Sequence, residues 1–407
     1  MDPIPAPASL AARIPALQEV LREEKLDGWL LYDFHGQNPT ALGALGLAGH
    51  MLTRRWYYLV PARGEPQLLV HAIEVGSFPQ EVPGRRLSYS SWQSLDAALR
   101  EMLAPLPRPP RLAMEYFPRA AIPYLSRVDA GTLETVRGLG AEVVSSAALV
   151  QRFLCRWTPH QVASHVRALR AIDDAKDAAF EQIGVALRRG AEPTEVSIQK
   201  FLMDRFAEAK LETDHPPIVA VNGHAGDPHY VPSERTPTPI RAGDMVLIDL
   251  WARHQGPDDV YADITWVAFC GDRPPAKLEE IFRVTAGGRD LGLETVRTAW
   301  REKRVLQGWQ VDRAVRDFIA SKGYGERFIH RTGHSIGRAV HGDGANLDDH
   351  ETHDTRELVE GLAFSIEPGI YLPQEGLGVR SEIDVVLTGE GPQVFSKVQQ
   401  EIVRIPC

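Results

Sequence analysis

The sequence predicts two domains of different fold class: a small α/β domain over residues 1–157 and an α+β domain with an antiparallel sheet over residues 158–407. The length of 407 residues exceeds the roughly 150 residues of a typical domain. Strand-like and helix-like segments alternate in the first part, which is typical of an α/β domain. In the second part, amphipathic helices precede and separate hairpin-like strands.

The first domain combines apolar residues at helical spacing with short apolar runs. The run Trp29–Tyr32 is typical of a buried strand, and the turn-prone residues 62–66 separate two further strands. The predicted elements are, in order, a helix over 17–26, strands over 29–32, 56–60 and 67–73, a helix over 93–104, a strand over 112–114 and a helix over 119–127.

The second domain opens with a clear helix start. Thr158 precedes Pro159, and Gln161 occupies the third helical position, which together form a capping box. A long apolar stripe follows until Gly190, and Thr194 caps the next helix. The later predicted elements are helices over 276–300 and 309–322 and strands over 245–252, 260–269, 362–370 and 379–387.

Two aspartates lie within apolar strands of this domain. Asp249 in MVLIDLWA and Asp263 in VYADITWVAF are each flanked by apolar residues. An unpaired charge in such a place costs several kcal/mol, so the two need a common explanation. The turn signal Gly256-Pro257 lets the strands pair as a hairpin, and cross-strand neighbours have Cβ atoms about 5 Å apart. The alternative is that one or both aspartates face solvent on an exposed sheet.

Two glutamates in similar settings weaken that alternative. Glu367 lies in LAFSIEPGIY, and Glu382 lies in GVRSEIDVVL, where Arg380 and Asp384 share its face. Four carboxylates repel one another unless cations lie between them. Two divalent ions would neutralise them, so the sequence predicts a dinuclear metal site.

The segment HRTGHSIG supplies a nitrogen ligand. It contains His330 and His334, with His341 shortly after and His229 upstream in DPHYVPS. A single histidine is usually a surface or core residue, but three within twelve residues, beside four buried acids, indicate a site. Its glycines allow the backbone to approach a metal closely. Oxygen ligands with one imidazole favour Mn²⁺, Co²⁺ or Zn²⁺ over metals that prefer thiolates.

The segments DLWA…YADITW, HRTGHSIG, SIEPGIY and VRSEID, in this order, resemble the motifs of the pita-bread metallopeptidases. This family includes methionine aminopeptidase, aminopeptidase P and prolidase. The resemblance covers about residues 158–400. The domain ahead of it is similar to the creatinase-type N-terminal domain of aminopeptidase P and prolidase, which methionine aminopeptidase normally lacks. The resemblance therefore implies a pita-bread catalytic domain behind a creatinase-like N-terminal domain.

The resemblance also implies a role for each matching residue. Asp249 would bind one metal, Asp263 and Glu382 would bridge both, and His334 with Glu367 would hold the second. Glu367 would also accept the proton of the bridging water. The remaining implied roles concern the substrate and the support of the ligands: His229 near the scissile bond, His341 at the substrate and tetrahedral intermediate, His330 in the pocket, and Arg380 bracing the ligand cluster.

The sequence departs from the family pattern at two places. Asp249 and Asp263 are 263 − 249 = 14 positions apart, three more than is usual. A longer hairpin tip would absorb the difference, and we expect Asp258 and Asp259 at this tip to be solvated rather than to act as rival ligands. Trp266 stands where the family commonly has arginine, which could alter the pocket wall or an ion pair.

The implied reaction is hydrolysis of an Xaa-Pro peptide bond, with manganese the expected metal. Proline has no N–H, so its subsite must offer an apolar wall instead of backbone acceptors. A dipeptidase must also bind the free carboxylate after proline. We expect His50, Arg54 or Arg55 to supply that cation, from the same subunit or across a homodimer. This favours a dipeptidase, with an aminopeptidase P that acts on longer peptides as the alternative.

Other classes of protein fit the sequence less well. Creatinase shares the fold but lacks the full metal set, and a pita-bread protein that only binds partners generally loses ligands that this chain keeps. The net charge of −9 gives no basic footprint for nucleic acid. No apolar run approaches the 18 or so residues of a membrane span, and the N-terminus lacks an export signal. With three isolated cysteines, the expected location is the cytoplasm.

Overall fold

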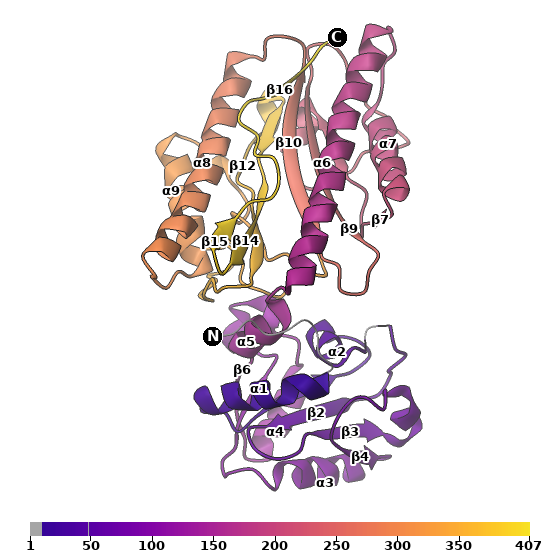
Figure 1. Cartoon of the computed structure of the whole chain (residues 1–407), viewed down its shortest axis with the longest axis vertical. Helices are drawn as coiled ribbons and strands as arrows, with labels where there is room; N and C mark the ends of the chain where they lie inside the picture. The colour runs from indigo at the N-terminus through magenta and orange to yellow at the C-terminus, as the bar shows by residue number, and fades with distance from the viewer. Residues whose placement is uncertain (1–9, 48) are drawn as a thin grey trace. The chain divides into compact units, whose positions relative to one another are not determined.

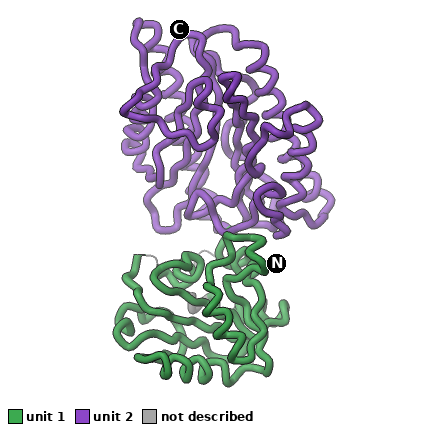
Figure 2. The backbone as a smooth tube through the Cα atoms, turned by 180° about the vertical axis from the view of Figure 1, so that it is seen from behind, with its two compact units in different colours: residues 1–156 green, residues 157–407 purple. Residues whose placement is uncertain are grey.

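The computed structural model describes residues 10–47 and 49–407. The chain forms two compact units, and the change from one to the other falls between Arg156 and Trp157 (Figure 2). Each unit has hydrophobic cores of its own.

The first unit is built on a six-stranded mixed sheet with the order β4-β3-β2-β1-β5-β6. β2 is antiparallel to both β1 and β3, whereas β5 runs parallel to β1 and β6. The strands are β1 (Gly28–Asp33), β2 (Trp56–Pro61), β3 (Gln67–His71), β4 (Arg85–Tyr89), β5 (Arg111–Met114) and β6 (Glu142–Ser145).

Helices cover both faces of this sheet (Figure 1). One core includes residues of α1, α2 and α5, and the other includes residues of α3 and α4. This arrangement confirms an α/β domain. The helices are α1 (Leu10–Glu23), α2 (Pro39–Leu45), α3 (Trp92–Leu103), α4 (Ala130–Gly138) and α5 (Ala147–Val150).

The predicted helix over 119–127 is wrong. These residues form two 3₁₀ turns, Pro118–Ala120 and Pro123–Leu125. Pro123 cannot donate an N–H to an earlier turn, and Arg119 has a φ of 57°, outside the helical region. The sequence pattern also did not predict α2, β4, α4, β6 and α5.

The second unit is built around the hairpin of β9 (Met245–His254) and β10 (Ala262–Cys270). They form a five-stranded sheet with β7 (Leu211–Glu212), β8 (Ile218–Val221) and β16 (Val403–Ile405). In one core, α6 (Pro159–Arg188) and α7 (Glu195–Glu208) pack against the hairpin. In another core, α8 (Ala276–Arg301) and α9 (Gly308–Ser321) pack together with other residues of the same two strands (Figure 1). Among the described residues, no helix has the length and apolar character needed to cross a membrane.

The predicted start of α6 is confirmed. The Thr158 hydroxyl accepts a hydrogen bond from the Gln161 backbone N–H, and the Gln161 side chain accepts one from the Thr158 N–H. Thr194 caps α7 through the same kind of reciprocal bonds with Ser197.

Two predicted strands are each interrupted. The expected strand over 362–370 forms β11 (Ala363–Ile366) and β12 (Gly369–Leu372), separated by Glu367-Pro368. The expected strand over 379–387 forms β13 (Leu377–Arg380) and β14 (Ile383–Thr388), separated by Ser381-Glu382. β11 pairs with β14, and β12 pairs with β13, so the two breaks face each other. β14 also pairs with the short strand β15 (Gly391–Gln393).

Candidate metal centre

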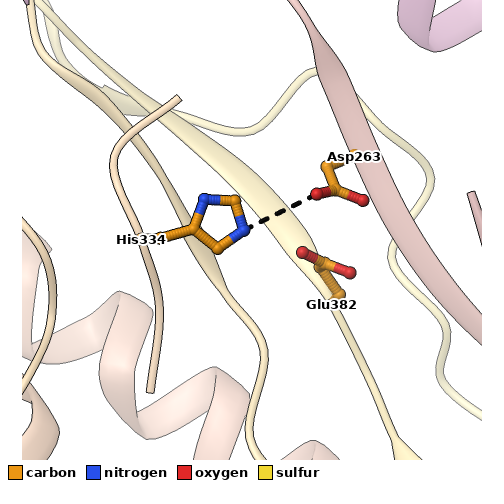
Figure 3. A group of neighbouring side chains, drawn as sticks. All are labelled: Asp263, His334 and Glu382. Atoms are coloured by element: carbon orange, nitrogen blue, oxygen red, sulfur yellow. Dashed lines mark ion pairs between the residues drawn. The ribbon is translucent and has the colours of Figure 1, made fainter. Parts of the chain in front are cut away.

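Three side chains meet above β10: Asp263, His334 and Glu382 (Figure 3). One potential ligand atom from each lies within 4.8 Å of the others. His334 Nε2 is 3.6 Å from Asp263 Oδ2. Their exposed fractions are only 3–4%. The structure thus brings together residues that lie 382 − 263 = 119 positions apart in the chain.

Glu367 extends this group from the break between β11 and β12. Its Oε1 is 3.3 Å from His334 Nε2 and accepts a hydrogen bond of 3.1 Å from the Ser365 hydroxyl. His334 Nδ1 lies 3.2 Å from the Ser335 carbonyl oxygen. A proton on Nδ1 leaves a lone pair on Nε2, the nitrogen that faces the carboxylates.

Asp249 lies beside Asp263. The two are not directly opposite each other, although the sequence predicted them as cross-strand neighbours. The register pairs Asp249 with Thr265 and Asp263 with Trp251, so the two aspartates are diagonal neighbours on one face. One oxygen of Asp249 accepts a hydrogen bond from Arg380 Nη2. After burial, the charge of Asp249 is one of the causes that raise the pKa of Asp263 and of Glu382.

The bonding of these carboxylates fits a cation. Asp263 Oδ1 and Glu382 Oε1 are buried, and neither has a hydrogen-bond partner among the described residues. Burial, and then the charges of the neighbouring carboxylates, raise the pKa of both groups well above the usual range. Buried oxygens without donors, next to an imidazole lone pair, satisfy the requirements of divalent metal ligands.

Thr265 and Asp384 support the ligands, although sequence reasoning assigned them no role. The Thr265 hydroxyl donates to Glu382 Oε2 at 2.7 Å. Asp384 Oδ2 accepts a hydrogen bond of 2.8 Å from the backbone N–H of Asp263. Both stand inside the motifs that carry the ligands, DIT and SEID, and the period of two already placed Asp384 on the face of Glu382.

Arg380 connects the ligands to a third missed residue, Tyr371. Arg380 Nη1 donates to the Tyr371 hydroxyl at 3.0 Å, and this hydroxyl is 2.7 Å from His330 Nε2. Burial raises the pKa of Tyr371 to about 12 and lowers that of His330 to about 3. A tyrosine hydroxyl and a neutral imidazole therefore hold the guanidinium against Asp249.

Two further predicted histidines lie on the exposed side of the group. The His341 ring packs edge-on against His334, with centroids 4.4 Å apart. Desolvation, then the charges of His334 and Arg331, lower the pKa of His341. His229 is exposed, and its charge contributes to the same lowering.

The loop that carries His229 is tied to the first turn of α7. The buried Glu195 carboxylate accepts hydrogen bonds from the Tyr230 hydroxyl at 2.6 Å and from the Val221 N–H at 2.7 Å. His224 Nδ1 lies 2.9 Å from the same carboxylate, and its ring stacks on Tyr230. Sequence reasoning missed this anchor because Glu195 is distant in sequence from the residues it holds.

One glycine of HRTGHSIG, Gly333, allows a close approach between backbone segments. A Cβ atom on Gly333 would lie 1.9 Å from the Ser365 carbonyl oxygen. The close approach is therefore between this segment and β11. It allows the His334 N–H to donate to the Ser365 hydroxyl at 3.0 Å.

Arg54, Arg55 and His50 belong to the first unit, in the segment that leads into β2. All three are exposed. The Arg54 backbone N–H donates to Glu74, the Arg55 carbonyl accepts from the Tyr89 hydroxyl, and His50 Nδ1 is 3.0 Å from the Ser77 carbonyl oxygen. These bonds fix the segment, and the Arg54 guanidinium also donates to the Thr53 hydroxyl at 3.0 Å.

The extra residues of the β9–β10 hairpin do not supply a ligand to the group, but the expectation that Asp259 is solvated is wrong. It is 6% exposed, and its carboxylate lies 3.2 Å from His160 Nε2 and accepts from the Gly256 N–H. It closes the hairpin tip and ties it to the start of α6.

Trp266 does not line the metal centre. It lies on the opposite face of β10 from Asp263 and Thr265, against α6. The Lys176 ammonium sits 3.4 Å from the centre of its ring and 2.9 Å from Asp177 Oδ1. The departure from the family pattern therefore concerns the packing of α6.

Comparison with known proteins identifies the family. The model of metallopeptidase family M24 matches residues 167–389, more than half of the chain. The chain belongs to metallopeptidase family M24. The matched region begins within α6 and contains all five predicted metal ligands.

Individual M24 relatives and structures agree with this assignment. An Xaa-Pro dipeptidase from Lactobacillus delbrueckii subsp. lactis is 32% identical over 244 residues, 60% of this chain and 61% of that protein. An Xaa-Pro dipeptidase from Pyrococcus horikoshii is 31% identical over 238 residues, 58% of this chain and 61% of that protein. These matches span about three fifths of the relatives' length.

The structural similarity extends over both units. The crystal structure of dipeptidase PepE from Mycobacterium ulcerans matches with a TM-score of 0.76 at 22% identity and covers 98% of both chains. This confirms the predicted fold class, a pita-bread unit preceded by an α/β unit.

Proposed function

We propose that this M24 protein is an Xaa-Pro dipeptidase that uses two divalent metal ions. The buried group of Asp263, His334 and Glu382 carries the proposal, because its oxygens lack donors and its imidazole faces them. The names of the two relatives, Xaa-Pro dipeptidases at 31–32% identity, support the choice of substrate.

The proposed ligand assignment is the one that the resemblance to the family implies, and the grouping of Asp263, His334 and Glu382 supports it. Asp249 would hold one ion, Asp263 and Glu382 both, and His334 with Glu367 the second. The ions would supply Lewis acidity and lower the pKa of a water molecule between them. Arg380 neutralises part of the charge of Asp249 and keeps its second oxygen available.

Glu367 is the general base of the proposed reaction. It is less buried than Asp263 and Glu382, and its Oε1 lies at the edge of the group, beside His334. It accepts the proton of the attacking water and passes it to the proline nitrogen as the peptide bond breaks. The Ser365 hydroxyl fixes the orientation of its carboxylate.

His341 and His229 stabilise the oxygen of the tetrahedral intermediate. Both side chains are exposed, and the His341 ring packs against His334. A lowered pKa keeps His341 neutral at pH 7, so that its N–H donates a hydrogen bond without giving up its proton. The cluster of Tyr261, Ile336 and Val340 provides an apolar wall for the proline ring, which needs no hydrogen-bond acceptor.

Substrate length provides the test. Protein stripped of metal and reloaded with Mn²⁺ should hydrolyse Ala-Pro much faster than Ala-Pro-Ala, and Asp263→Ala should hydrolyse neither. Equal turnover of the tripeptide would contradict the dipeptidase proposal. Loss of both activities in the reloaded wild type, with metal bound, would contradict the proposed enzyme altogether.

Recognition of the free carboxylate is proposed for Arg54 and Arg55, with His50, from the exposed loop before β2. Arg54→Gln and Arg55→Gln should raise the KM for Ala-Pro about tenfold, as expected for loss of a charge-assisted hydrogen bond. They should leave the KM for Ala-Pro amide unchanged. An equal rise for both substrates would argue against carboxylate binding.

We further propose Mn²⁺ as the preferred metal, with Co²⁺ or Zn²⁺ as substitutes, a homodimeric assembly and a cytoplasmic location. The oxygen-rich ligand set favours manganese. Three isolated cysteines without pairing spacing suit a reducing compartment. Activity titrations of the stripped protein with each metal and light scattering of the holoprotein test the first two proposals, and fractionation of source cells tests the third.

A further inference from the structure

The edge of β9 away from β10 carries a short segment that borders the metal centre. β7 pairs Glu212 with Arg253, and β8 pairs Ile218 with Asp249. The connecting residues 213–217 therefore pass alongside residues 250–252 of β9. They flank β9 on the edge opposite to β10, the strand that carries Asp263.

Trp251 joins this segment to the ligands. It is the register partner of Asp263 and stands two residues after Asp249, so its side chain lies on the ligand-bearing face. The indole is half-buried and packs with Tyr261, Ile336 and Val340. The indole N–H donates a hydrogen bond of 2.6 Å to Asp214 Oδ1.

Asp214 keeps one oxygen available to a ligand. Its side chain is 48% exposed, and His215 Nδ1 is 3.5 Å from Oδ2, beyond a good hydrogen bond. The nearby Arg253 is engaged elsewhere, with Glu212 at 2.6 Å and its guanidinium over the Tyr261 ring.

We propose that Asp214 and Trp251 form the subsite for the side chain that precedes proline, and that this subsite selects a basic side chain, lysine or arginine. The inference rests on the proposed Xaa-Pro peptidase function. A cation gains a charge-assisted hydrogen bond from the carboxylate and an attractive contact with the indole. Arginine gains most, because its planar guanidinium stacks on aromatic rings and bonds carboxylates in a defined geometry.

The position of the pair favours a side chain over the substrate's own ammonium group. The α-ammonium is separated from the scissile carbonyl by one carbon and therefore stays within the ligand group. Trp251 lies two residues, about 7 Å, further along β9 than Asp249. A lysine or arginine side chain spans that distance.

Citrulline provides a neutral control of the same shape as arginine. In the Mn²⁺-loaded protein we expect kcat/KM for Arg-Pro to exceed that for citrulline-Pro by about five- to tenfold, the range of a partly exposed charged hydrogen bond. Asp214→Asn, whose amide oxygen can still accept from Trp251, should remove this preference and leave citrulline-Pro unchanged. Trp251→Phe should reduce it in part, because the ring remains but the bond that orients Asp214 is lost.

The exposed Asp272, which follows β10, provides a variant with the same change of charge. Asp272→Asn should retain the preference, which separates a local contact from the net charge of the protein. Equal rates for Arg-Pro and citrulline-Pro in the wild type, or an equal loss for both in Asp214→Asn, would overturn the subsite.

A binding measurement keeps this test separate from that of the proposed function. If the loaded protein hydrolyses no proline dipeptide, calorimetric titration with L-arginine and L-citrulline still decides the matter. Tighter binding of arginine that is lost in Asp214→Asn supports the subsite while the peptidase proposal fails. Equal binding of the two amino acids overturns the subsite.

Discussion

At the scale of single residues, Asp263 has a backbone and a side chain that differ in their hydrogen bonding. Its N–H donates to the buried carboxylate of Asp384, whereas its own Oδ1 has no partner among the described residues. Folding has thus buried a charge that protein groups do not compensate. Such an arrangement lowers stability until a cation binds.

The metal-free protein should therefore lose stability as pH rises. Burial, then the charges of Asp249 and Glu367, raise the pKa of Asp263 above its ordinary value. A carboxyl of this kind contributes stability below its unfolded pKa of about 3.9, and the contribution is lost as pH rises through the folded pKa. In EDTA, we expect the free energy of unfolding to fall as pH rises above about 4, and Asp263→Asn to recover about 1–3 kcal/mol at neutral pH.

Urea unfolding of wild type and Asp263→Asn at a series of pH values measures this effect. Mn²⁺ should stabilise the wild type and have little effect on the variant. Identical slopes of stability against pH in the two proteins would show that the Asp263 carboxylate is not the source.

Tyr371→Phe tests the support of Arg380. The change removes only the hydroxyl that lies between Arg380 and His330. Loss of such an outer contact typically lowers metal affinity or activity about 10- to 100-fold, and we expect an effect in that range with the fold unchanged. Metal titration monitored by activity and by calorimetry provides the measurement.

Tyr324→Phe is the matched control, because its hydroxyl bonds Glu280 and Lys277 on α8 rather than the ligand group. If both variants bind Mn²⁺ as the wild type does, the Tyr371 hydroxyl is not needed to hold Arg380 in place for metal binding.

At the scale of elements, the sequence predicts the apolar strands well but not the points at which two of them are interrupted. The apolar strands around Asp249 and Asp263 are visible in the sequence because they are nearly continuous runs of apolar residues, buried on both faces. The breaks at Glu367 and Glu382 are not, because they depend on partners outside the strand. The Glu367 N–H donates to Thr332 and the Glu382 N–H to Thr265, and these bonds replace the ladder.

The same distinction, between local patterns and distant contacts, explains which residues of the site could be predicted from the sequence. The prediction of a metal site followed from acids in apolar strands, a local property of Asp249, Asp263, Glu367 and Glu382. The supports Tyr371, Thr265 and Asp384 were missed because their residue types are common and only their contacts give them a role. The wrong helix over 119–127 has a local cause, Pro123, which pattern counting underweighted.

A helix cap gives a prediction at this scale. Thr158→Ala removes the side chain that accepts from Gln161 at the start of α6. Loss of such a cap typically costs about 1 kcal/mol, and we expect the second unit to lose that much stability. Denaturant unfolding of the Mn²⁺-loaded protein provides the measurement. Because α6 carries no predicted ligand, metal affinity should stay the same, and a large loss of affinity would contradict this separation.

At the scale of the whole molecule, all five predicted ligands belong to the second unit, which ends the chain. Metal should therefore stabilise the segments that carry them. In hydrogen exchange of the full chain, Mn²⁺ should slow exchange most in β10, in β13–β14 and around His334, because binding to the folded state suppresses local opening. Asp263→Asn should abolish the difference. Protection confined to other segments would place the metal elsewhere.

The spread of the ligands along the chain determines when the centre can come into being. A ribosome that has added Asp249 must add 382 − 249 = 133 more residues before Glu382 exists. No shorter stretch of nascent polypeptide contains all five predicted ligands. With these residues as the ligands, the complete metal site forms only after the α/β unit and the β9–β10 hairpin have been synthesised.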